Sequence, residues 1–313
     1  MSDCAGPVPS GPKPPWLRIR LDTGSNYRMV RGMIEGLKLH TVCQEARCPN
    51  IYECWGDRTA TFMILGDVCT RRCGFCAVAT GRPRAVDPEE PERLAEAVKH
   101  LALEHAVITM VDRDDLPDGG AAHVGAVIRA VRRGNPGCEV EILTSDFRDV
   151  RRPLEVILPE GPVTFSHNVE TVPRLYPTVR RGSTFERSLG LLRDAVLWRR
   201  SARRPLVKTG LMVGLGETRD ELLDTFALLA GAGVEILTLG QYLRPSLAHL
   251  PVERYWHPDE FAALRLEALR LGFRHVEAGP LVRSSYHARR HTESAGSSVP
   301  AAEAVLDSPA AAT

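Results

Sequence analysis

The chain of 313 residues lacks long hydrophobic runs and lacks an excess of charge of either sign. No stretch without a charged residue exceeds ten positions, whereas a helix that crosses a bilayer needs about 20 apolar residues. The 40 Lys and Arg residues stand against 39 Asp and Glu, so no global field favours nucleic acid or anionic lipid. Residues 1–16 have no apolar core behind a basic start and predict neither a secretory nor an organellar signal. We expect a cytoplasmic protein with no membrane and no nucleic-acid partner.

The motifs of several enzyme classes are missing as well. The ten histidines form no H-E-x-x-H or comparable constellation, and neither a Ser/His/Asp nucleophile motif nor a Walker-type phosphate loop occurs. A hydrophobic content of 43% is nevertheless enough to bury a core, which excludes disorder as the dominant state. The chemistry of this chain must therefore come from other residues.

Cysteine is the residue type whose distribution is informative, because six of the 8 cysteines fall between positions 43 and 76. They form two groups of three, Cys43-x4-Cys48-x5-Cys54 and Cys69-x3-Cys73-x2-Cys76. In a reducing compartment, clustered thiols are more often metal ligands than disulfides. Each group is one ligand short of a structural zinc site, although a binuclear zinc site that shares all six thiolates is an alternative. A 4Fe-4S cluster takes one thiolate per iron, so three thiolates hold it and leave one iron open.

The second group, with Phe75 before its last cysteine, matches the motif of the radical S-adenosylmethionine enzymes. The segment 41–83 contains both groups and resembles the lipoyl synthases of that superfamily. The resemblance covers roughly residues 15–290, and further motifs that carry it lie at 111–121, 167–180, 210–218, 240–246 and 279–288. Several short segments depart from the family pattern, and none of them contains a cysteine. Cys4 and Cys138 have no partner at ligand spacing and are expected to be structural.

The resemblance implies an activity, cofactors and partners. Lipoyl synthases insert two sulfur atoms at C6 and C8 of an octanoyl-lysine on a carrier domain. They use 5'-deoxyadenosyl radicals made from S-adenosylmethionine at one 4Fe-4S cluster, and an auxiliary 4Fe-4S cluster is the sulfur source. The implied partners are an octanoylated lipoyl carrier protein, either the glycine-cleavage H-protein or a dehydrogenase E2 lipoyl domain, and a flavodoxin- or ferredoxin-type reductant.

The same resemblance implies the cluster ligands. Those of the cluster that binds S-adenosylmethionine are Cys69, Cys73 and Cys76, and those of the auxiliary cluster are Cys43, Cys48, Cys54 and Ser285. The hydroxyl of Ser285 would complete the auxiliary site, and Ser284 is the neighbouring alternative. Serine oxygen matches iron less well than thiolate does, so a serine-bound iron should be the easiest to release when that cluster is dismantled.

Residues that follow the expected strands are candidates for contacts to S-adenosylmethionine, and these are Asp112, Asn168, Glu170, Arg180, Gly214 and Gly216. Asn168 and Glu170 are candidates for the ribose hydroxyls. Arg180 is a candidate for the methionyl carboxylate, with an ordinary capping or salt-bridge role as the alternative. Asp112 is a candidate for the methionyl ammonium, although a loop of alternating charges is often a solvated turn. The two glycines would let the backbone approach the adenine.

Short aliphatic or β-branched runs alternate with longer amphipathic stretches along the chain, a pattern typical of parallel β/α units. Strands are expected at 61–66, 106–111, 138–143, 163–167, 207–214 and 235–240. Helix start signals occur at Asp87-Pro88-Glu89-Glu90 and Thr218-x-x-Glu221, and further helices are expected at 121–133, 185–200 and 259–271. Six such units predict an α/β fold, a partial, open (β/α)6 TIM-like barrel, which is also the fold that the resemblance implies.

Three parts are expected along the chain. Residues 1–58 form an N-terminal extension with the auxiliary-cluster cysteines, 59–280 the radical S-adenosylmethionine barrel, and 281–313 a segment with the sequence RSSY that closes over the barrel, followed by a tail. Residues 1–15 and 291–313 are expected to be disordered. Function in a β/α barrel lies at the C-terminal ends of the strands, which is where the second cysteine group and the polar candidates are expected.

Two other functions fit part of the pattern. A methylthiotransferase shares the second cysteine group but carries its other three cysteines in a separate N-terminal domain, usually with a basic C-terminal module, and the sequence shows neither. A non-catalytic iron-sulfur or zinc protein, acting as a scaffold or sensor, is the alternative outside enzymes. Cleavage of S-adenosylmethionine by the reconstituted protein would exclude the second alternative.

Overall fold

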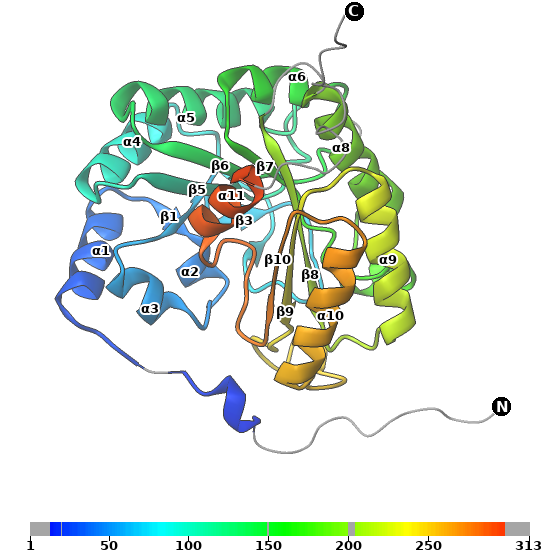
Figure 1. The fold of residues 1–313 in the computed structure, drawn as a ribbon. Helices are drawn as coiled ribbons and strands as arrows, with labels where there is room; N and C mark the ends of the chain where they lie inside the picture. The colour runs from blue at the N-terminus through cyan, green and yellow to red at the C-terminus, as the bar shows by residue number, and fades with distance from the viewer. Residues whose placement is uncertain (1–12, 20, 149, 200–203, 298–313) are drawn as a thin grey trace, which may run out of the picture.

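A sheet of mostly parallel strands, covered by helices on its outer face, is the centre of the molecule (Figure 1). The structure is a computed structural model, and it describes residues 13–19, 21–148, 150–199 and 204–297. Within these ranges the main sheet has 8 strands in the order β1-β2-β5-β6-β7-β8-β9-β10. All neighbours are parallel except β1 and β2, which are antiparallel. The architecture is the expected open, TIM-like barrel.

The strands of the main sheet are β1 (His40–Thr41), β2 (Thr61–Ile64), β5 (His105–Met110), β6 (Glu139–Leu143), β7 (Thr164–Ser166), β8 (Leu206–Val213), β9 (Ile236–Gln241) and β10 (His275–Gly279). All six expected strands are confirmed, as β2 and β5 to β9. The sequence analysis missed β1, which has two residues, and β10, whose sequence HVEAG has no aliphatic run. A second, two-stranded sheet pairs β3 (Val68–Cys69) with β4 (Ala79–Thr80).

The helices are α1 (Ser25–Gly36), α2 (Val42–Glu45), α3 (Ile51–Gly56), α4 (Glu90–His100), α5 (Ala121–Gly134), α6 (Leu154–Ile157), α7 (Tyr176–Val179), α8 (Phe185–Trp198), α9 (Arg219–Gly231), α10 (Pro258–Arg270) and α11 (Ala288–Ser297). Short 3-10 turns lie at Pro15–Leu17, Leu158–Glu160 and Pro173–Leu175. The capping box at the start of α9 is present, since Thr218 accepts from the Glu221 N–H and the Glu221 carboxylate accepts from the Thr218 N–H. Helix α4 begins at Glu90, later than its start signal suggested, although the Asp87 side chain accepts from the Glu89 N–H.

Burial follows from this layered arrangement. Parallel strands covered by helices lose contact with water on both faces, and β8 and β9 are buried along almost their whole length. The largest fully buried side chains include Trp55, Phe62, Phe165 and Phe226. No helix within the described ranges is long and apolar enough to span a membrane.

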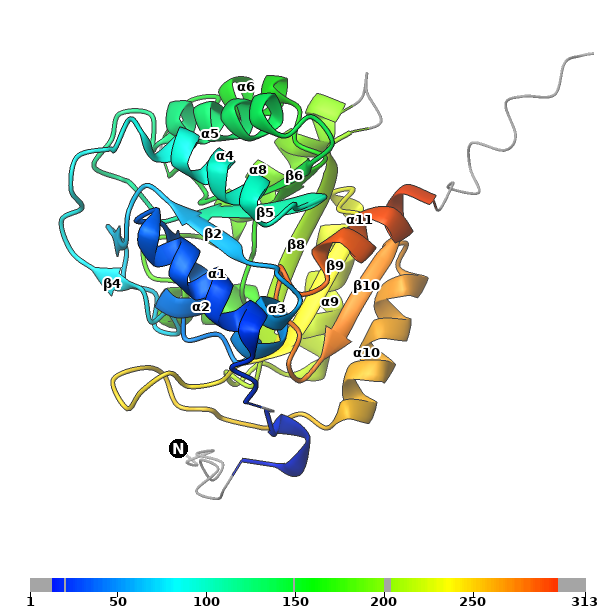
Figure 2. The same cartoon turned by 90° about the vertical axis from the view of Figure 1, so that its left-hand side faces the viewer.

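The two ends of the described chain lie against the barrel (Figure 2). Helices α1, α2 and α3 lie beside β2, and α11 lies beside β10 and also contacts β5 and β8. The expectation that the chain is disordered from residue 291 is wrong for 291–297, which form most of α11. His291 and Ala295 are fully buried there. Residues 1–12 and 298–313 lie outside the described residues.

Candidate functional site

One cavity of about 470 Å³ brings together most of the candidate residues. Members of both cysteine groups line it, as do the polar candidates that follow the strands. From the cysteine groups these are Cys43, Cys48, Cys69, Cys73 and Cys76, and from the other candidates they are Asp112, Asn168, Glu170, Arg180, Ser284 and Ser285. The cavity therefore joins segments that are more than two hundred residues apart in the sequence.

The loop of Cys69, Cys73 and Cys76 is fixed at its base and at its tip. At the base, β3 and β4 pair, and the Gly81 N–H donates to the Cys69 carbonyl. At the tip, the Gly74 N–H donates to the Val179 carbonyl at 2.9 Å. A Cβ at Gly74 would lie 2.8 Å from the Leu250 side chain, so glycine permits this close approach. These contacts fix the turn that carries the three cysteines to the rest of the barrel.

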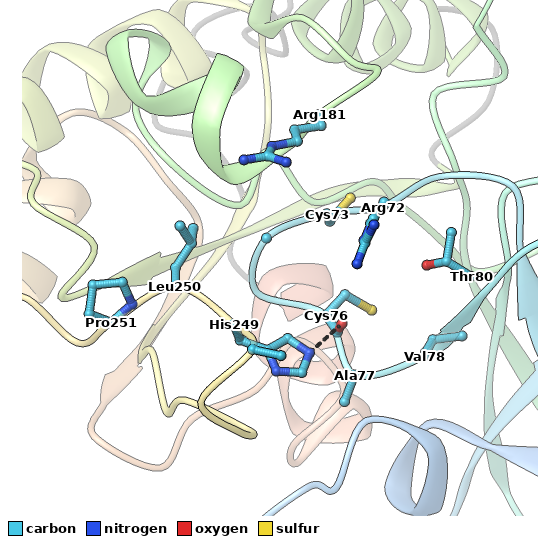
Figure 3. Close-up of a pocket in the computed structure, with 12 residues that line it drawn as sticks. Arg72, Cys73, Cys76, Ala77, Val78, Thr80, Arg181, His249, Leu250 and Pro251 are labelled. Carbon is cyan, nitrogen blue, oxygen red and sulfur yellow. Dashed lines mark hydrogen bonds between the residues drawn. The ribbon is translucent and has the colours of Figure 1, made fainter.

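The outer side of this loop faces a second cavity, of about 750 Å³ (Figure 3). Arg72, Arg181 and His249 line it together with Cys73 and Cys76. The His249 Nε2 lies 3.0 Å from the Cys76 carbonyl oxygen, and this contact joins the cysteine loop to the segment after β9. The loop is thus accessible from two sides.

Burial governs the chemistry of the thiols. Every cysteine in the described ranges is free of disulfides. Burial raises the pKa of Cys43 and Cys76 to about 11 and that of Cys54 and Cys69 to about 12. Thiolates at these places need a positive charge beside them, which a bound metal centre provides. Two sets of three free thiols with this property fit 4Fe-4S clusters.

Arg71, which the sequence analysis missed, organises the acidic side of the cavity. Its guanidinium contacts the carboxylates of Asp112 at 3.2 Å, Asp114 at 2.8 Å and Asp146 at 2.6 Å. Burial disfavours the charged form of Asp146, but Arg71 outweighs burial and holds the pKa of that carboxyl below its usual range. Asp112 also accepts from the Cys69 thiol at 3.6 Å. Asp112 is therefore held in a buried ionic network and is not in a solvated turn.

Glu170 and Arg180 both follow β7 and line the cavity, close enough for their charges to interact. Glu170 has a φ of 68° and forms an isolated bridge with Leu211, so its backbone is strained and fixed. Its buried carboxyl has a raised pKa, because burial outweighs the charge of Arg180. Arg180 donates from Nη1 to the Asn168 carbonyl oxygen and to His167 Nε2, at 3.1 Å for the latter.

The side-chain oxygen of Asn168 is a hydrogen-bond acceptor without a donor among the described residues. This oxygen, Oδ1, is buried. Gly210 leaves the space for it, since a Cβ there would lie 2.8 Å from that oxygen. A buried polar atom without a partner is costly, so this amide oxygen fits a ligand that donates a hydrogen bond, such as a ribose hydroxyl.

Gly214 and Gly216 are not among the described residues that line the cavity. Gly214 has a φ of 97°, and a Cβ there would lie 2.4 Å from the Arg254 carbonyl oxygen. Its N–H donates to the Glu217 carboxylate, which also accepts from Trp256 Nε1. The glycine therefore permits a tight turn inside the protein, and contact of this segment with adenine stays a prediction.

The first cysteine group lies at the start of β2, next to Ser285. Cys43 is in α2, Cys48 follows it, and Cys54 is in α3, close enough to both for their charges to interact. Thr61 links this group to Ser285: its N–H hydrogen-bonds to the Cys43 sulfur, and its hydroxyl donates to Ser285 Oγ at 2.8 Å.

The segment that carries Ser285 is attached at several points. Asn50 Nδ2 donates to the Leu281 carbonyl oxygen at 2.8 Å, and the Tyr286 hydroxyl donates to Glu53 at 2.8 Å. Gly240 at the end of β9 makes room for it, because a Cβ there would lie 2.0 Å from the Val282 carbonyl oxygen. The sequence contains these residues, but their role depends on contacts between distant segments.

Comparison with known proteins gives the family. Residues 63–229 match the model of the radical SAM superfamily, and residues 11–48 match that of the N-terminal domain of lipoyl synthase. A lipoyl synthase of Rubrobacter xylanophilus is 56% identical over 90% of this chain and 87% of its own. One of Koribacter versatilis is 51% identical over 92% and 94%. The chain belongs to the lipoyl synthase family.

Solved structures share the fold of this chain. Methylornithine synthase (PylB) superimposes with a TM-score of 0.51 at 14% identity, over 80% of this chain and 81% of its own. Streptococcus suis SuiB, in a crystal structure with S-adenosylmethionine, gives a TM-score of 0.53 at 11% identity, over 74% and 54%. At these identities the similarity supports the radical SAM fold alone.

Family membership also gives the reaction class. A lipoyl synthase is a sulfurtransferase that inserts two sulfur atoms into a protein-bound octanoyl group, and it uses two 4Fe-4S clusters and S-adenosylmethionine. The free, buried thiols and the unpaired Asn168 oxygen fit these cofactors. The expectations on family, fold, activity and cofactors are confirmed.

Proposed function

We propose that the two cysteine groups hold the two clusters on opposite sides of one reaction chamber. Cys69, Cys73 and Cys76 hold the cluster that binds S-adenosylmethionine. The auxiliary cluster is held by Cys43, Cys48, Cys54 and Ser285. The observation that carries this proposal is the single cavity lined by members of both groups and by both serines. When bound, the first cluster supplies the electron that cleaves S-adenosylmethionine, and the auxiliary cluster supplies sulfur at C6 and C8 of the octanoyl chain.

Charge in the cavity matches the methionyl part of S-adenosylmethionine. Asp112 lies beside Cys69 and accepts from the ammonium group, while Arg71 keeps its carboxylate oriented. Arg180 lies on the other wall and attracts the methionyl carboxylate. Its contacts with Asn168 and His167 all use Nη1, so the rest of the guanidinium is available to a ligand.

The ribose lies between Asn168 and Glu170 in this proposal. The Asn168 Oδ1 accepts from one hydroxyl, which relieves the cost of its buried, unpartnered state. The Glu170 carboxylate, held by a strained backbone, accepts from the other. Both side chains exclude water from the place where a primary carbon radical has to reach the substrate.

Ser285 is the better ligand candidate of the two serines. Thr61 contacts both the Cys43 sulfur and Ser285 Oγ, which places Ser285 beside the auxiliary group. The hydrogen bond from Thr61 stabilises negative charge on Ser285 Oγ, and a negatively charged oxygen is the form that binds iron. Ser284 lines the same cavity, and its Oγ has no comparable link to a cysteine in the described contacts.

The octanoyl chain has an apolar path between the two groups. Met63, Met110 and Leu211 line the cavity there, and a flexible hydrocarbon is stabilised against such side chains. The chain arrives on an octanoylated lipoyl carrier protein, the glycine-cleavage H-protein or a dehydrogenase E2 lipoyl domain. We infer that the N-terminal extension, the barrel and the closing segment act as three parts around this path.

The electron enters from the second cavity in this proposal. Cys73 and Cys76 line it, and the exposed Arg72 and Arg181 lie at its rim. Positive side chains favour encounter with an acidic electron carrier, and a flavodoxin- or ferredoxin-type protein has that character. We place the reaction in the cytoplasm, where reducing conditions preserve free thiols.

Anaerobic reconstitution tests the proposed function. The protein is supplied with iron and sulfide, its iron is counted, and it is then mixed with reductant, S-adenosylmethionine and an octanoyl-lysine peptide. We expect about eight irons per chain, since two cubane clusters contain four each, together with deoxyadenosine and a peptide mass gain of two sulfurs, less two hydrogens once the dithiol is oxidised in air to the cyclic disulfide. Cleavage of S-adenosylmethionine with an unchanged peptide would show that octanoyl-lysine is not the substrate. Absence of cleavage would refute the radical chemistry.

A further inference from the structure

Three possible metal ligands come together away from the cavity, where α11 lies beside β10 (Figures 1 and 2). His275 and Glu277 are two residues apart on β10, so their side chains point to the same face of the sheet. His291 lies on α11, and its ring faces the ring of His275. None of the three is among the described residues that line the reaction cavity.

The distances fit a single small ion. His275 Nε2 lies 3.5 Å from Glu277 Oε2, and His291 Nε2 lies 3.8 Å from the same oxygen. One ligand atom from each residue lies within 4.8 Å of the others. Two ligands at the usual zinc bond lengths of about 2.0–2.1 Å are separated by about 3.4 Å in a tetrahedral site. The two histidine nitrogens lie within about 0.4 Å of this separation from the Glu277 oxygen and have to approach each other to bind one ion, whereas the distances to Glu277 are too long for good hydrogen bonds.

The two histidines lack the partners that buried imidazoles normally have. The His291 side chain is 0% exposed, and neither of its ring nitrogens has a hydrogen-bond partner in the described structure. The same is true of His275 Nε2. Unpaired buried nitrogens are costly, and a metal ion would use their lone pairs.

Burial and neighbouring cations disfavour the protonated form of His291, and the carboxylate of Glu277 supplies the negative charge that offsets these cations at the cluster. Lys208, fully buried, pairs with Glu141 at 2.7 Å, and its charge acts on His291 together with the other histidines. Burial and these charges lower the pKa of His291 far below its usual range.

We propose that His275, Glu277 and His291 bind one Zn²⁺ ion. Two imidazoles and one carboxylate are an established zinc donor set, in which water takes the fourth position. The half-buried Glu277 lies on the solvent side and gives both the entry path and room for that water. The fully buried His291 leaves little space for the additional ligands that an octahedral ion requires.

The ion would join the two flanks of the segment that carries Ser284 and Ser285. His275 and Glu277 precede this segment in the chain, and His291 follows it. Zinc would therefore hold α11 on β10 and restrict the motion of the segment between them. The metal site itself does not depend on the proposed function, and only this positioning role rests on it.

Zinc counting and X-ray absorption test the proposal on the holoenzyme. The protein with both clusters is equilibrated with Zn²⁺, desalted and analysed for zinc and iron, so that the cysteines are already occupied. We expect one zinc per chain. Its absorption spectrum should show nitrogen and oxygen ligands with imidazole scattering and no sulfur at about 2.3 Å.

Two ligand variants and one control make the result decisive. Glu277→Gln keeps the shape of the side chain and should weaken zinc binding at least tenfold, with unchanged iron content. His275→Ala should do the same. His100→Ala removes an exposed histidine of α4 and should bind zinc like the unmodified protein. Equal zinc retention by Glu277→Gln, absence of zinc from the unmodified holoenzyme, or a sulfur shell in the spectrum would overturn the proposal, whatever the lipoyl activity.

Discussion

At the scale of residues, the two cysteine groups differ in what surrounds them. The second group lies between two cavities, beside the acidic network of Arg71. The first group lies among α2, α3 and the segment that carries Ser285. The same thiol chemistry is therefore placed in two settings, one that borders two cavities and one that lies next to the segment with Ser285.

This difference predicts that alanine variants separate the two partial reactions. Cys73→Ala should abolish deoxyadenosine formation, because the cluster that binds S-adenosylmethionine loses a ligand. Cys54→Ala should retain cleavage but form no lipoyl product. Quantifying deoxyadenosine and modified peptide in the same assay checks both. Equal loss of the two products in Cys54→Ala, with normal folding, would contradict separate roles.

Ser285 and Ser284 form a matched pair for a second prediction. Ser285→Ala should reduce sulfur insertion by about 10- to 100-fold, the range seen when metal-site partners are removed, and should leave cleavage of S-adenosylmethionine intact. Ser284→Ala should stay close to the unmodified protein. Product formation per cleaved S-adenosylmethionine is the measurement. The reverse ranking of the two variants would assign the ligand to Ser284.

The sequence predicted the site residues whose spacing is local and missed those whose role is tertiary. The cysteines could be found because only two to five residues separate neighbours within a group. Arg71 could not, since its partners Asp112 and Asp146 lie on other strand ends and only the fold brings them together. Gly240 is recognisable only once Val282 is known to pack on it.

At the scale of elements, local signals predicted most strands of the main sheet and the long helices α4, α5, α8, α9 and α10, but not α1 or the short helices. The hydrophobic runs predicted six strands, and the capping motif at Thr218 predicted the start of α9. Strand β10 was missed because its sequence HVEAG has no aliphatic run, and helix α11 because its residues are small or polar throughout. The positions of His275, Glu277 and His291 are explained only by the packing of α11 on β10.

The capping box of α9 predicts a measurable stability change. Thr218→Ala removes the acceptor for the Glu221 N–H and should lower the free energy of unfolding by about 1 kcal/mol. Thr218→Ser keeps the hydroxyl and serves as the control. Denaturant titrations of the three proteins in the same cluster state provide the comparison, and equal midpoints for alanine and serine would show that the box contributes nothing.

At the scale of the whole molecule, the fold gathers charged side chains around one cavity although the net charge of the chain is close to zero. The net charge is +1, yet the buried Arg71 and Arg180 and the half-buried Asp112 and Glu170 line one cavity. Composition could predict a folded core but not this segregation of charge, which arises because parallel strands end at a common edge.

Buried His167 predicts how the stability of the molecule depends on pH. Its Nε2 accepts from Arg180, and burial together with that cation lowers its pKa to about 3 from the usual 6.5. The unfolded chain therefore binds a proton between pH 6.5 and 3 that the folded chain does not, so stability falls as the pH falls through this window. The contribution of one such group reaches at most about 1.4 kcal/mol per pH unit.

Denaturant unfolding at pH 7 and pH 5.5 measures this dependence. His167→Gln cannot take up a proton and should reduce the loss of stability between the two pH values, even if its stability at pH 7 is lower. An identical pH dependence in the variant would show that other groups cause it.

The most direct test of the central claim follows the origin of the inserted sulfur. The protein is reconstituted with iron and ³⁴S-sulfide, freed of unbound sulfide, and allowed a single turnover with S-adenosylmethionine, reductant and octanoyl-lysine peptide. If the first cysteine group with Ser285 holds the sulfur source, the product contains two heavy sulfur atoms, and Cys54→Ala forms none. A lipoyl product with light sulfur, or labelled product from Cys54→Ala, would contradict the account.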